Sequence, residues 1–493
     1  MTATLIWWGI AVYVVASAIV AILSRSGSSV TMSDYFLGSR SMGATVSALS
    51  YSATTYSAFM MVGLAGLTYS GGVGALGFEI VYFAGVSLVA IFGPRFWAVG
   101  KRFGFVTPAE MLGARYGSRW VAVSAALVSC VFLIPYSAVQ LSGVGYLVSG
   151  MSDGAISYGT GIVIATGLAI AFSYIAGIRS VMWTDSLQAL MMVVASTLVA
   201  ALVVSELGGL GGLFSTLSDT RPEMLSVPGP GLFSFTTFVG LTVPWFFFSI
   251  SNPQVSQRLF MPASLGAMRR MLLIFLCFGL VYTLVSVLWG LSAAVAFPGL
   301  ENADLATSVL LSSEFVPPLL GVIVMIGILA AAVSTIDSIL LTLSSTLARD
   351  VYGASGRSED RIQLRVGKVV IPVISLCALG FAALELNLIA VLSVAASAGL
   401  VVAVPAIVGA FFWRRGTAAG ALASLLGGGV FVAAMYLTGN SLLGLNAGIL
   451  GLPVASLLFV GVSLVTRPQS DMADAFVTEA APGRRIKRRS RLA

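Results

Sequence analysis

The chain contains no histidine, and only 9% of its 493 residues are charged. The absence of imidazole excludes histidine-based acid/base catalysis, metal ligation and proton relays. So few charges also exclude a soluble domain of this length, because soluble domains carry about 25% charged residues. With 58% apolar residues, the sequence predicts an all-α integral membrane protein, since helices satisfy their own backbone groups in lipid.

Cysteines and nucleotide-binding motifs are also scarce. The three cysteines, Cys130, Cys277 and Cys377, lie inside apolar runs. Because their number is odd, we expect small buried hydrophobes rather than a disulfide framework. No G-x-x-x-x-G-K-[ST] motif occurs, which disfavours an ATP-driven pump. No long polar segment offers room for an enzyme domain, so the sequence indicates a transporter that is gradient-driven or passive, not an enzyme.

Apolar runs of about 20 residues predict transmembrane helices, and thirteen can be marked. They lie near residues 4–23, 42–70, 72–98, 120–148, 155–176, 181–204, 232–252, 270–297, 317–347, 366–386, 388–412, 417–437 and 446–466. If the N-terminus is outside the cell, every Lys and Arg except Arg221 falls in a cytoplasmic segment, as the positive-inside rule requires. The C-terminus is then cytoplasmic, and we expect a multi-pass protein of the plasma membrane.

The basic C-terminal tail, residues 467–493, is open to two interpretations. Nucleic-acid binding is one of them. A cytoplasmic end that touches anionic lipid headgroups explains the same charges and agrees with the topology. We therefore expect membrane lipid as a partner and no nucleic acid.

Two spans carry polar groups where a lipid-facing helix stays apolar. The stretch SALSYSATTYSAFMM, residues 47–61, holds eight hydroxyl side chains, and the span 317–347 contains VSTIDS. Sodium needs about five or six oxygens, and an unwound membrane helix supplies free carbonyls. The alternative is that the small hydroxylated residues permit close packing and bond their own i−4 carbonyls. Clustering in both spans favours a cation site.

Further polar groups fall inside predicted spans. Glu79, Asp185 and Asp337 are carboxylates within or at the edge of spans, where ionisable groups are costly and usually functional. For Asp185 the alternative is a helix-entry residue favoured by the macrodipole. Pro244 and Pro253 predict that the span 232–252 is broken. Gln140 is predicted to contact either substrate or another helix.

The motifs DYFLGSRSMG, SALSYSATTYSA, WTDSLQ, W-x3-S-x3-P and LAAAVSTIDS occur in order over residues 34–412. This ordered set resembles the sodium:solute symporter family, which includes sodium-coupled proline, sugar and sialic acid transporters. The resemblance implies a LeuT-type core of two inverted five-helix repeats in residues 35–412. Repeat one covers about 42–204 and repeat two about 232–412, with one extra helix and its loop in 1–34 and two peripheral helices in 413–466.

The resemblance also implies site residues. The family's sodium site falls on the backbone carbonyls of Ala53, Tyr56 and Ala331 and the hydroxyls of Ser334 and Thr335. A second cation site, present in some members, falls on Asp185, Ser334, Asp337 and Ser338. The substrate candidates are Thr54, Thr55, Gln140, Trp245, Ser249 and Asn252. Arg40 and Pro253 are candidates for gating or coupling, although Arg40 also fits simple positive-inside anchoring.

Two departures bear on the substrate. Thr55 and Ser249 stand where the proline transporter carries an aspartate and a tyrosine, whereas GFVTPAEMLGARYGSR and IPYSAVQLSG resemble the monocarboxylate and pantothenate branch. We therefore expect a sodium-coupled symporter that imports a small organic solute, such as a monocarboxylate or a pantothenate-like acid. No obligatory protein partner is evident. The alternatives are a proton-coupled symporter of an amino acid or sugar, and a passive facilitator.

Overall fold

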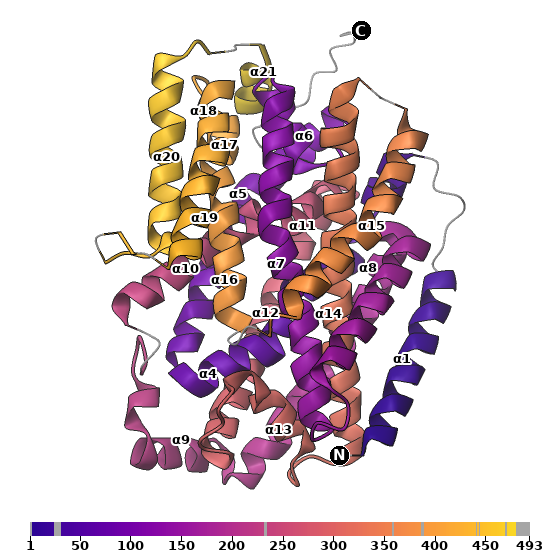
Figure 1. Cartoon of the computed structure of the whole chain (residues 1–493), viewed down its shortest axis with the longest axis vertical. Coiled ribbons are helices and arrows are strands. Elements are labelled where there is room, and N and C mark those ends of the chain that lie inside the picture. The colour runs from indigo at the N-terminus through magenta and orange to yellow at the C-terminus, as the bar shows by residue number, and fades with distance from the viewer. Residues whose placement is uncertain are drawn as a thin grey trace.

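The computed structural model describes residues 2–23, 31–230, 234–356, 359–385, 389–439, 441–442, 444–468 and 471–479. These residues form helices joined by turns and loops, and most of the long helices run along the long axis of the molecule (Figure 1). The predicted all-α architecture is therefore confirmed. Most of the basic tail lies outside the described residues.

Ten helices among the described residues are long and apolar enough to cross a membrane. They are α1 (Ala3–Leu23), α5 (Gly74–Phe103), α7 (Arg119–Met151), the second part of α8 (Gly177–Glu206), α12 (Leu265–Ala296), α14 (Pro318–Thr346), α15 (Asp360–Ala382), the pair α16 (Ile389–Leu400) and α17 (Val404–Phe412), the pair α18 (Ala418–Leu422) and α19 (Gly428–Thr438), and α20 (Ala447–Val465). Each coincides with one predicted span.

The other three predicted spans are bent or interrupted. The first consists of α3 (Ala44–Thr55) and α4 (Ala65–Gly71), with a π-helical turn at Phe59–Leu64 between them. The second is the first part of α8 (Tyr158–Glu206), which bends at Gly177, where φ is +62°; glycine adopts this conformation freely. The third is α10 (Phe235–Ser251), which Asn252 separates from α11 (Pro253–Ser256). Pro244 lies inside α10 without ending it.

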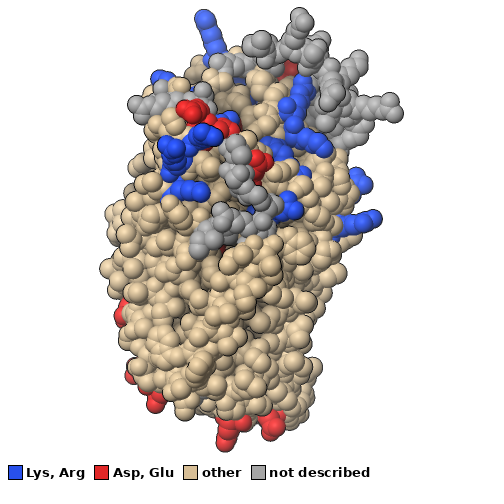
Figure 2. Space-filling model, turned by 90° about the vertical axis from the view of Figure 1, so that its right-hand side faces the viewer, with Lys and Arg blue, Asp and Glu red and all other residues tan. Residues whose placement is uncertain are grey.

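The short helices lie at the two ends of the molecule. In Figure 1, α6 (Pro108–Arg115) and α21 (Asp471–Asp474) are at one end, and α9 (Gly209–Thr220) and α13 (Ala306–Ser312) are at the other. Figure 2 shows Lys and Arg gathered around the α6 end, acidic side chains at the α9 end, and a broad uncharged band between them. Such a band is what a bilayer requires of the surface that it contacts.

The interrupted helices lie in the interior. Helix α3 packs against α8, α12 and α14, and α10 packs against α5 and α16. Irregular backbone at membrane depth is tolerated where protein surrounds it, and both breaks are surrounded by other helices. Helix α1 packs on α8 and α14 and lies at the outer edge of the bundle (Figure 1).

Close packing of α5 on α10 gives a first testable prediction. A Cβ atom on Gly85 would lie 1.9 Å from the carbonyl oxygen of Phe246. Gly85→Ala should therefore destabilise the protein by about 1–3 kcal/mol, as overpacking does. Gly167→Ala is the matched control, because nothing lies within 4 Å of a Cβ there and alanine is the better helix former. Melting temperatures in detergent measure both, and equal values would contradict the prediction.

Candidate functional site

The break between α3 and α4 is the centre of the site. Helix α3 ends at Thr55, and Tyr56 leaves the helical conformation with φ −93° and ψ 69°. The N–H of Tyr56 still bonds the carbonyl of Ser52, at 2.7 Å. The carbonyls at the end of an interrupted helix need other partners. Ala53, two residues before this end, is fully buried, so its carbonyl must find that partner inside the protein.

That partner is Thr335 of α14. Its Oγ1 donates a hydrogen bond to the carbonyl oxygen of Ala53, at 3.2 Å. Ala331 lies one turn earlier on α14 and is fully buried. Two of the five predicted sodium ligands are therefore in direct contact across two helices. Neutral carbonyl and hydroxyl oxygens are the ligands that a hard monovalent cation accepts, so the donor set fits sodium.

A buried ion pair lies beside this contact. Arg258 Nη2 is 3.2 Å from Asp185 Oδ2, and both side chains are almost fully buried. Ser50 Oγ donates to the same carboxylate oxygen at 2.6 Å, and Ser334 Oγ donates to the other. The Arg258 guanidinium also donates to the hydroxyls of Ser50 and Ser338. The negative charge of Asp185 is thus already neutralised by a side chain of the protein.

The sequence predicts that Arg258 lies in a cytoplasmic segment, whereas the structure buries its side chain. The chain does not leave the protein after the break at Asn252. It continues through α11 and a short 3-10 helix, Gln257–Phe260, whose four residues are all buried. Gln257 Nε2 anchors this segment by donating to the carbonyl of Val106 at 2.9 Å. Arg258 therefore lies in the interior of the protein. No local pattern in the sequence indicates which residue it pairs with.

Asp337 is separate from this pair. Ser173 Oγ donates to Asp337 Oδ1 at 2.8 Å, and no described Lys or Arg lies within 4 Å of the Asp337 carboxylate. Of the four residues predicted for a second cation, Asp185, Ser334 and Ser338 lie in one hydrogen-bonded network with Arg258, and Asp337 has a different partner.

Trp245, a predicted substrate residue, lies in an aromatic cluster beside the break. Its ring is 4.9 Å from that of Phe59, which follows the break, and stacks at 5.4 Å on Phe78 of α5. Trp245 Nε1 donates to Glu79 Oε2 at 3.2 Å. The sequence indicates only that Glu79 is a carboxylate inside a span, where ionisable groups are costly. In the structure this carboxylate orients the indole of Trp245.

Gln140 lies against the same break. Tyr136, one turn earlier on α7, contacts the ring of Phe248 at 6.1 Å. Gly143, about one turn later, is so close to Ala58 that a Cβ on it would lie 3.2 Å from the Ala58 methyl group. Gln140 shares this face of α7. Its side chain is fully buried, and neither of its amide atoms has a hydrogen-bond partner among the described residues.

The remaining substrate candidates lie in other surroundings. Ser249 Oγ donates to the carbonyl of Gly85 at 3.3 Å, and Asn252 Oδ1 accepts from Ser251 at 3.1 Å. Thr54 Oγ1 is 3.1 Å from Ser338 Oγ, so it borders the ion-pair network in this conformation. Thr55 is buried at the end of α3. Substrate contact by these residues stays a prediction.

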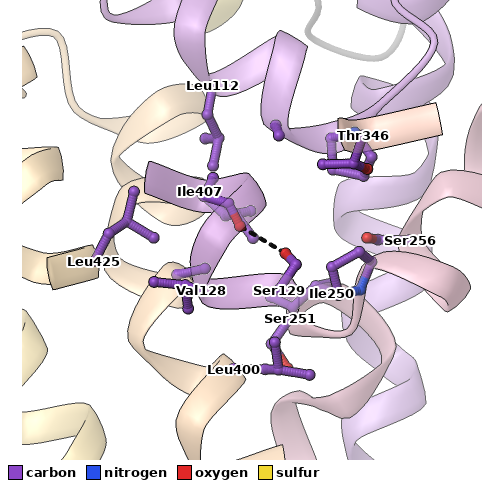
Figure 3. A pocket seen from close by; sticks show the side chains of 15 residues that line it. Leu112, Val128, Ser129, Ile250, Ser251, Ser256, Thr346, Leu400, Ile407 and Leu425 are labelled. Carbon is purple, nitrogen blue, oxygen red and sulfur yellow. Dashed lines mark hydrogen bonds between the residues drawn. The ribbon is translucent and has the colours of Figure 1, made fainter. Parts of the chain in front are cut away.

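A small cavity of about 30 Å³ borders the break in α10. Figure 3 shows it between Ser251 and Ser256 on one side and Val128 and Leu425 on the other. The Ser129 hydroxyl bonds the carbonyl of Ala125 at 2.7 Å, so it has no need of a ligand. The cavity has room for a water or two but not for a solute, and its position gives the segment after the break some room to move.

Arg40, a predicted gating residue, joins two loops. Its Nη2 donates to the carbonyl of Phe105 at 2.7 Å, which ties the segment before α3 to the segment before α6. The turn that carries Arg40 is fixed by Ser39, whose hydroxyl donates to Asp34 at 2.7 Å. This bond, followed by one from Thr31, lowers the pKa of the Asp34 carboxyl, which keeps the carboxylate ionised and the turn in place.

Comparison with known proteins shows the family of this chain. The profile of the sodium:solute symporter family matches residues 35–428. The chain belongs to this family. The Sodium/pantothenate symporter of Escherichia coli (strain K12) is 29% identical over 442 residues, which cover 87% of this chain and 89% of that protein. The High-affinity proline transporter PutP of Bacillus subtilis (strain 168) is 27% identical over 413 residues, which cover 81% and 86%.

A solved structure shares the fold. The outward-open, substrate-bound state of a Na+-coupled sialic acid symporter superposes with a TM-score of 0.79 at 18% identity, covering 95% of this chain and 99% of that one. At this identity the match shows the fold alone, which is LeuT-like as predicted. As a family member with these relatives, the symporter is a multi-pass protein of the plasma membrane that couples solute transport to sodium.

Proposed function

We propose that this symporter imports a small organic acid together with sodium by alternating access. The observation that carries the proposal is the contact between Thr335 Oγ1 of α14 and the Ala53 carbonyl at the break of α3. Two helices that are far apart in sequence meet there through neutral oxygens, so one cation bound between them would hold the two helices together. The proposed ligands are the carbonyls of Ala53, Tyr56 and Ala331 and the hydroxyls of Ser334 and Thr335.

The proposed topology has thirteen spans, with the N-terminus outside and the C-terminus cytoplasmic. It is supported by the concentration of Lys and Arg at the end of the molecule that carries α6 (Figure 2). Helix α1 begins at the opposite end and α20 finishes at the α6 end (Figure 1), as an odd number of crossings requires. The two proposed repeats, about 42–204 and 232–412, each begin with an interrupted helix.

The proposed substrate class follows from Gln140. A buried amide without partners costs about 1–3 kcal/mol, so a ligand that uses both of its atoms gains affinity. A hydroxy acid does this, because its carboxylate accepts from Nε2 and its hydroxyl donates to Oε1. A pantothenate transporter among the relatives supports this class. The aromatic cluster around Trp245 would cover the apolar part of the solute.

Movement in the proposed cycle occurs at the breaks. Sodium bound at Ala53 and Thr335 fixes the end of α3 and thereby preforms the substrate site next to it. Opening toward the cytoplasm then requires the segment after Pro253 and the loop held by Arg40 to separate from α6 and its neighbours. The bond from Arg40 to the carbonyl of Phe105 is one contact that this movement breaks.

A ligand screen tests the proposal. Melting temperatures in detergent should rise more with a true substrate when sodium is present than when potassium replaces it. Small hydroxy acids should outperform amino acids and sugars. The variant Gln140→Leu should weaken substrate binding about tenfold, or about 1.4 kcal/mol, and leave sodium binding without substrate unchanged. Unchanged substrate affinity would remove Gln140 from the site.

Two other functions are distinguished by transport assays. A passive facilitator on this fold would not raise the solute concentration inside proteoliposomes above that outside. A proton-coupled symporter of an amino acid or sugar would transport equally well when potassium replaces sodium, and would respond to pH. Accumulation that requires sodium excludes both.

A further inference from the structure

The segment that follows the last long helix returns to the body of the protein. Helix α20 ends at Val465, and further along the chain forms α21 and a π-helical turn, Ala475–Glu479. Helix α21 packs against α6, and the turn packs against α17. Figure 1 shows α21 and α6 at the same end of the molecule. We call residues 471–479 the C-terminal segment; none of the predicted site residues lies in it.

Phe476 anchors the C-terminal segment. Its side chain is fully buried, and its ring stacks on that of Phe103, the last residue of α5, at 6.0 Å. It also contacts the ring of Phe105 at 6.2 Å and that of Phe411 in α17 at 5.6 Å. Burial of one phenylalanine side chain favours the docked segment about tenfold or more.

An ion pair lies beside this anchor. Asp474 Oδ1 is 3.1 Å from Nε of Arg414, which lies just beyond the end of α17. Both side chains are largely exposed, so their attraction is weak. Reversal of one charge, however, replaces the attraction by repulsion. The ion pair therefore allows the docking of the segment to be weakened without a change in the core.

The loop that Phe476 covers joins elements that the proposed transport cycle separates. Backbone carbonyls of the loop 105–107 accept from Arg40 at 2.7 Å and from Gln257 at 2.9 Å. The threonine of this loop donates to Asp350 at 2.6 Å. These three partners come from the segment before α3, from the segment after the break in α10, and from the helical run that continues α14. A contact that holds the loop in place thus holds all three together.

A row of aromatic rings connects Phe476 with the segment after the break by a second route. The ring of Phe411 is 5.5 Å from that of Phe96 in α5. Phe96 in turn is 5.6 Å from Phe260, the last residue of the buried 3-10 helix that carries Arg258. Removal of the Phe476 ring would leave one end of this row without its neighbour.

We propose that the C-terminal segment is a latch. While Phe476 is docked, the loop 105–107 stays bonded to Arg40 and Gln257, and the α6 end of the protein stays closed. Undocking weakens this closed arrangement and raises the population of the state that is open at that end. The proposal rests on the proposed alternating access, and it adds a step whose rate the C-terminal segment sets.

The reactivity of one buried cysteine measures the opening. Ser256→Cys, in a full chain whose three native cysteines are replaced by serine, places a thiol in the wall of the cavity beside the α10 break. Ser256 is 1% exposed, so a water-soluble maleimide should label this thiol slowly in detergent. Phe476→Ala should raise the labelling rate about tenfold. Val477→Ala, the matched control at the next and partly exposed residue, should leave the rate unchanged.

Charge reversal provides an independent variant if Phe476→Ala fails to fold. Asp474→Arg changes an exposed residue and places two cations at the position of the ion pair. It should speed the labelling of Ser256→Cys several-fold. The swapped pair, Asp474→Arg with Arg414→Asp, restores the attraction and should return the rate to the slow value. A loss of general stability would not be reversed in this way.

A second buried cysteine separates opening from general loosening. Ser375 lies in α15 and is 2% exposed, and Ser375→Cys should label slowly whether or not Phe476 is replaced. Equal acceleration at both cysteines, or an unchanged rate at Ser256→Cys, would overturn the latch. Sodium should slow the labelling of Ser256→Cys while Phe476 is present, because it fixes the break in α3. If sodium has no effect in any variant, the proposed sodium-coupled cycle is overturned instead.

Discussion

Thr335→Ala should abolish most sodium-dependent uptake while the protein still folds. The Thr335 hydroxyl donates a hydrogen bond to the Ala53 carbonyl, at 3.2 Å. Its removal leaves the proposed cation one ligand short at the helix break. We expect sodium affinity at this site to fall at least about tenfold, or about 1.4 kcal/mol. Sodium titrations of melting temperature and uptake by proteoliposomes measure the two effects.

Coupling makes the prediction more specific. Substrate affinity measured without sodium should stay near the wild-type value, and the increase in affinity that sodium normally produces should disappear. Thr342→Ala is the matched control, because Thr342 is a buried threonine two turns further along α14. Wild-type sodium dependence in Thr335→Ala would refute the assignment of the site, and an equal defect in Thr342→Ala would assign the effect to packing.

The break in α3 could be predicted from the sequence because the pattern that indicates it is local. Hydroxylated residues interrupt an apolar run near Thr54 and Tyr56, and the structure ends α3 at Thr55. The break at Asn252 was predicted for the same reason, since Pro253 cannot donate to a continuing helix. Pro244 carries the same local signal but lies inside α10, because surrounding protein supports a helix across it.

The partners of the buried charged residues could not be predicted from the sequence. Arg258 and Asp185 are 73 residues apart, and nothing in the local pattern indicates that a residue after a helix break turns inward. Glu79 and Trp245, which are 166 residues apart, pose the same problem. Periodicity predicts which residues share a face of a helix, but the neighbour of that face is decided by tertiary packing.

The number of spans shows a related limit. Apolar length predicts thirteen spans, and ten helices among the described residues meet the criterion of length and composition. The difference arises where the chain bends or breaks, in α3 with α4, in the first part of α8, and in α10. Departures from regular helix geometry are expected at functional sites. Hydropathy therefore predicts these three segments correctly as membrane segments, but it does not predict where their helices bend or end.

The largest effect on stability is expected from Arg258. Arg258→Met leaves Asp185 as a buried carboxylate with no cationic partner, and breaking a buried pair in this way typically costs about 3–5 kcal/mol. The melting temperature should fall strongly. The double variant Asp185→Asn with Arg258→Met removes both charges and should recover most of the loss. Arg349→Met is the control, because its pair with Glu110 is partly exposed and such pairs contribute about 0–1 kcal/mol.

Sodium should restore part of the stability that Arg258→Met loses. Without the guanidinium, Asp185 is surrounded by the hydroxyls of Ser50 and Ser334, which together make a set of oxygens suited to a cation. The melting temperature of Arg258→Met should therefore rise more steeply with sodium than that of the wild type, and potassium should have less effect. The double variant, which has no carboxylate to compensate, should not show the steeper rise. An equal sodium response in all three proteins would mean that Arg258 supports the fold without occupying the position of a cation.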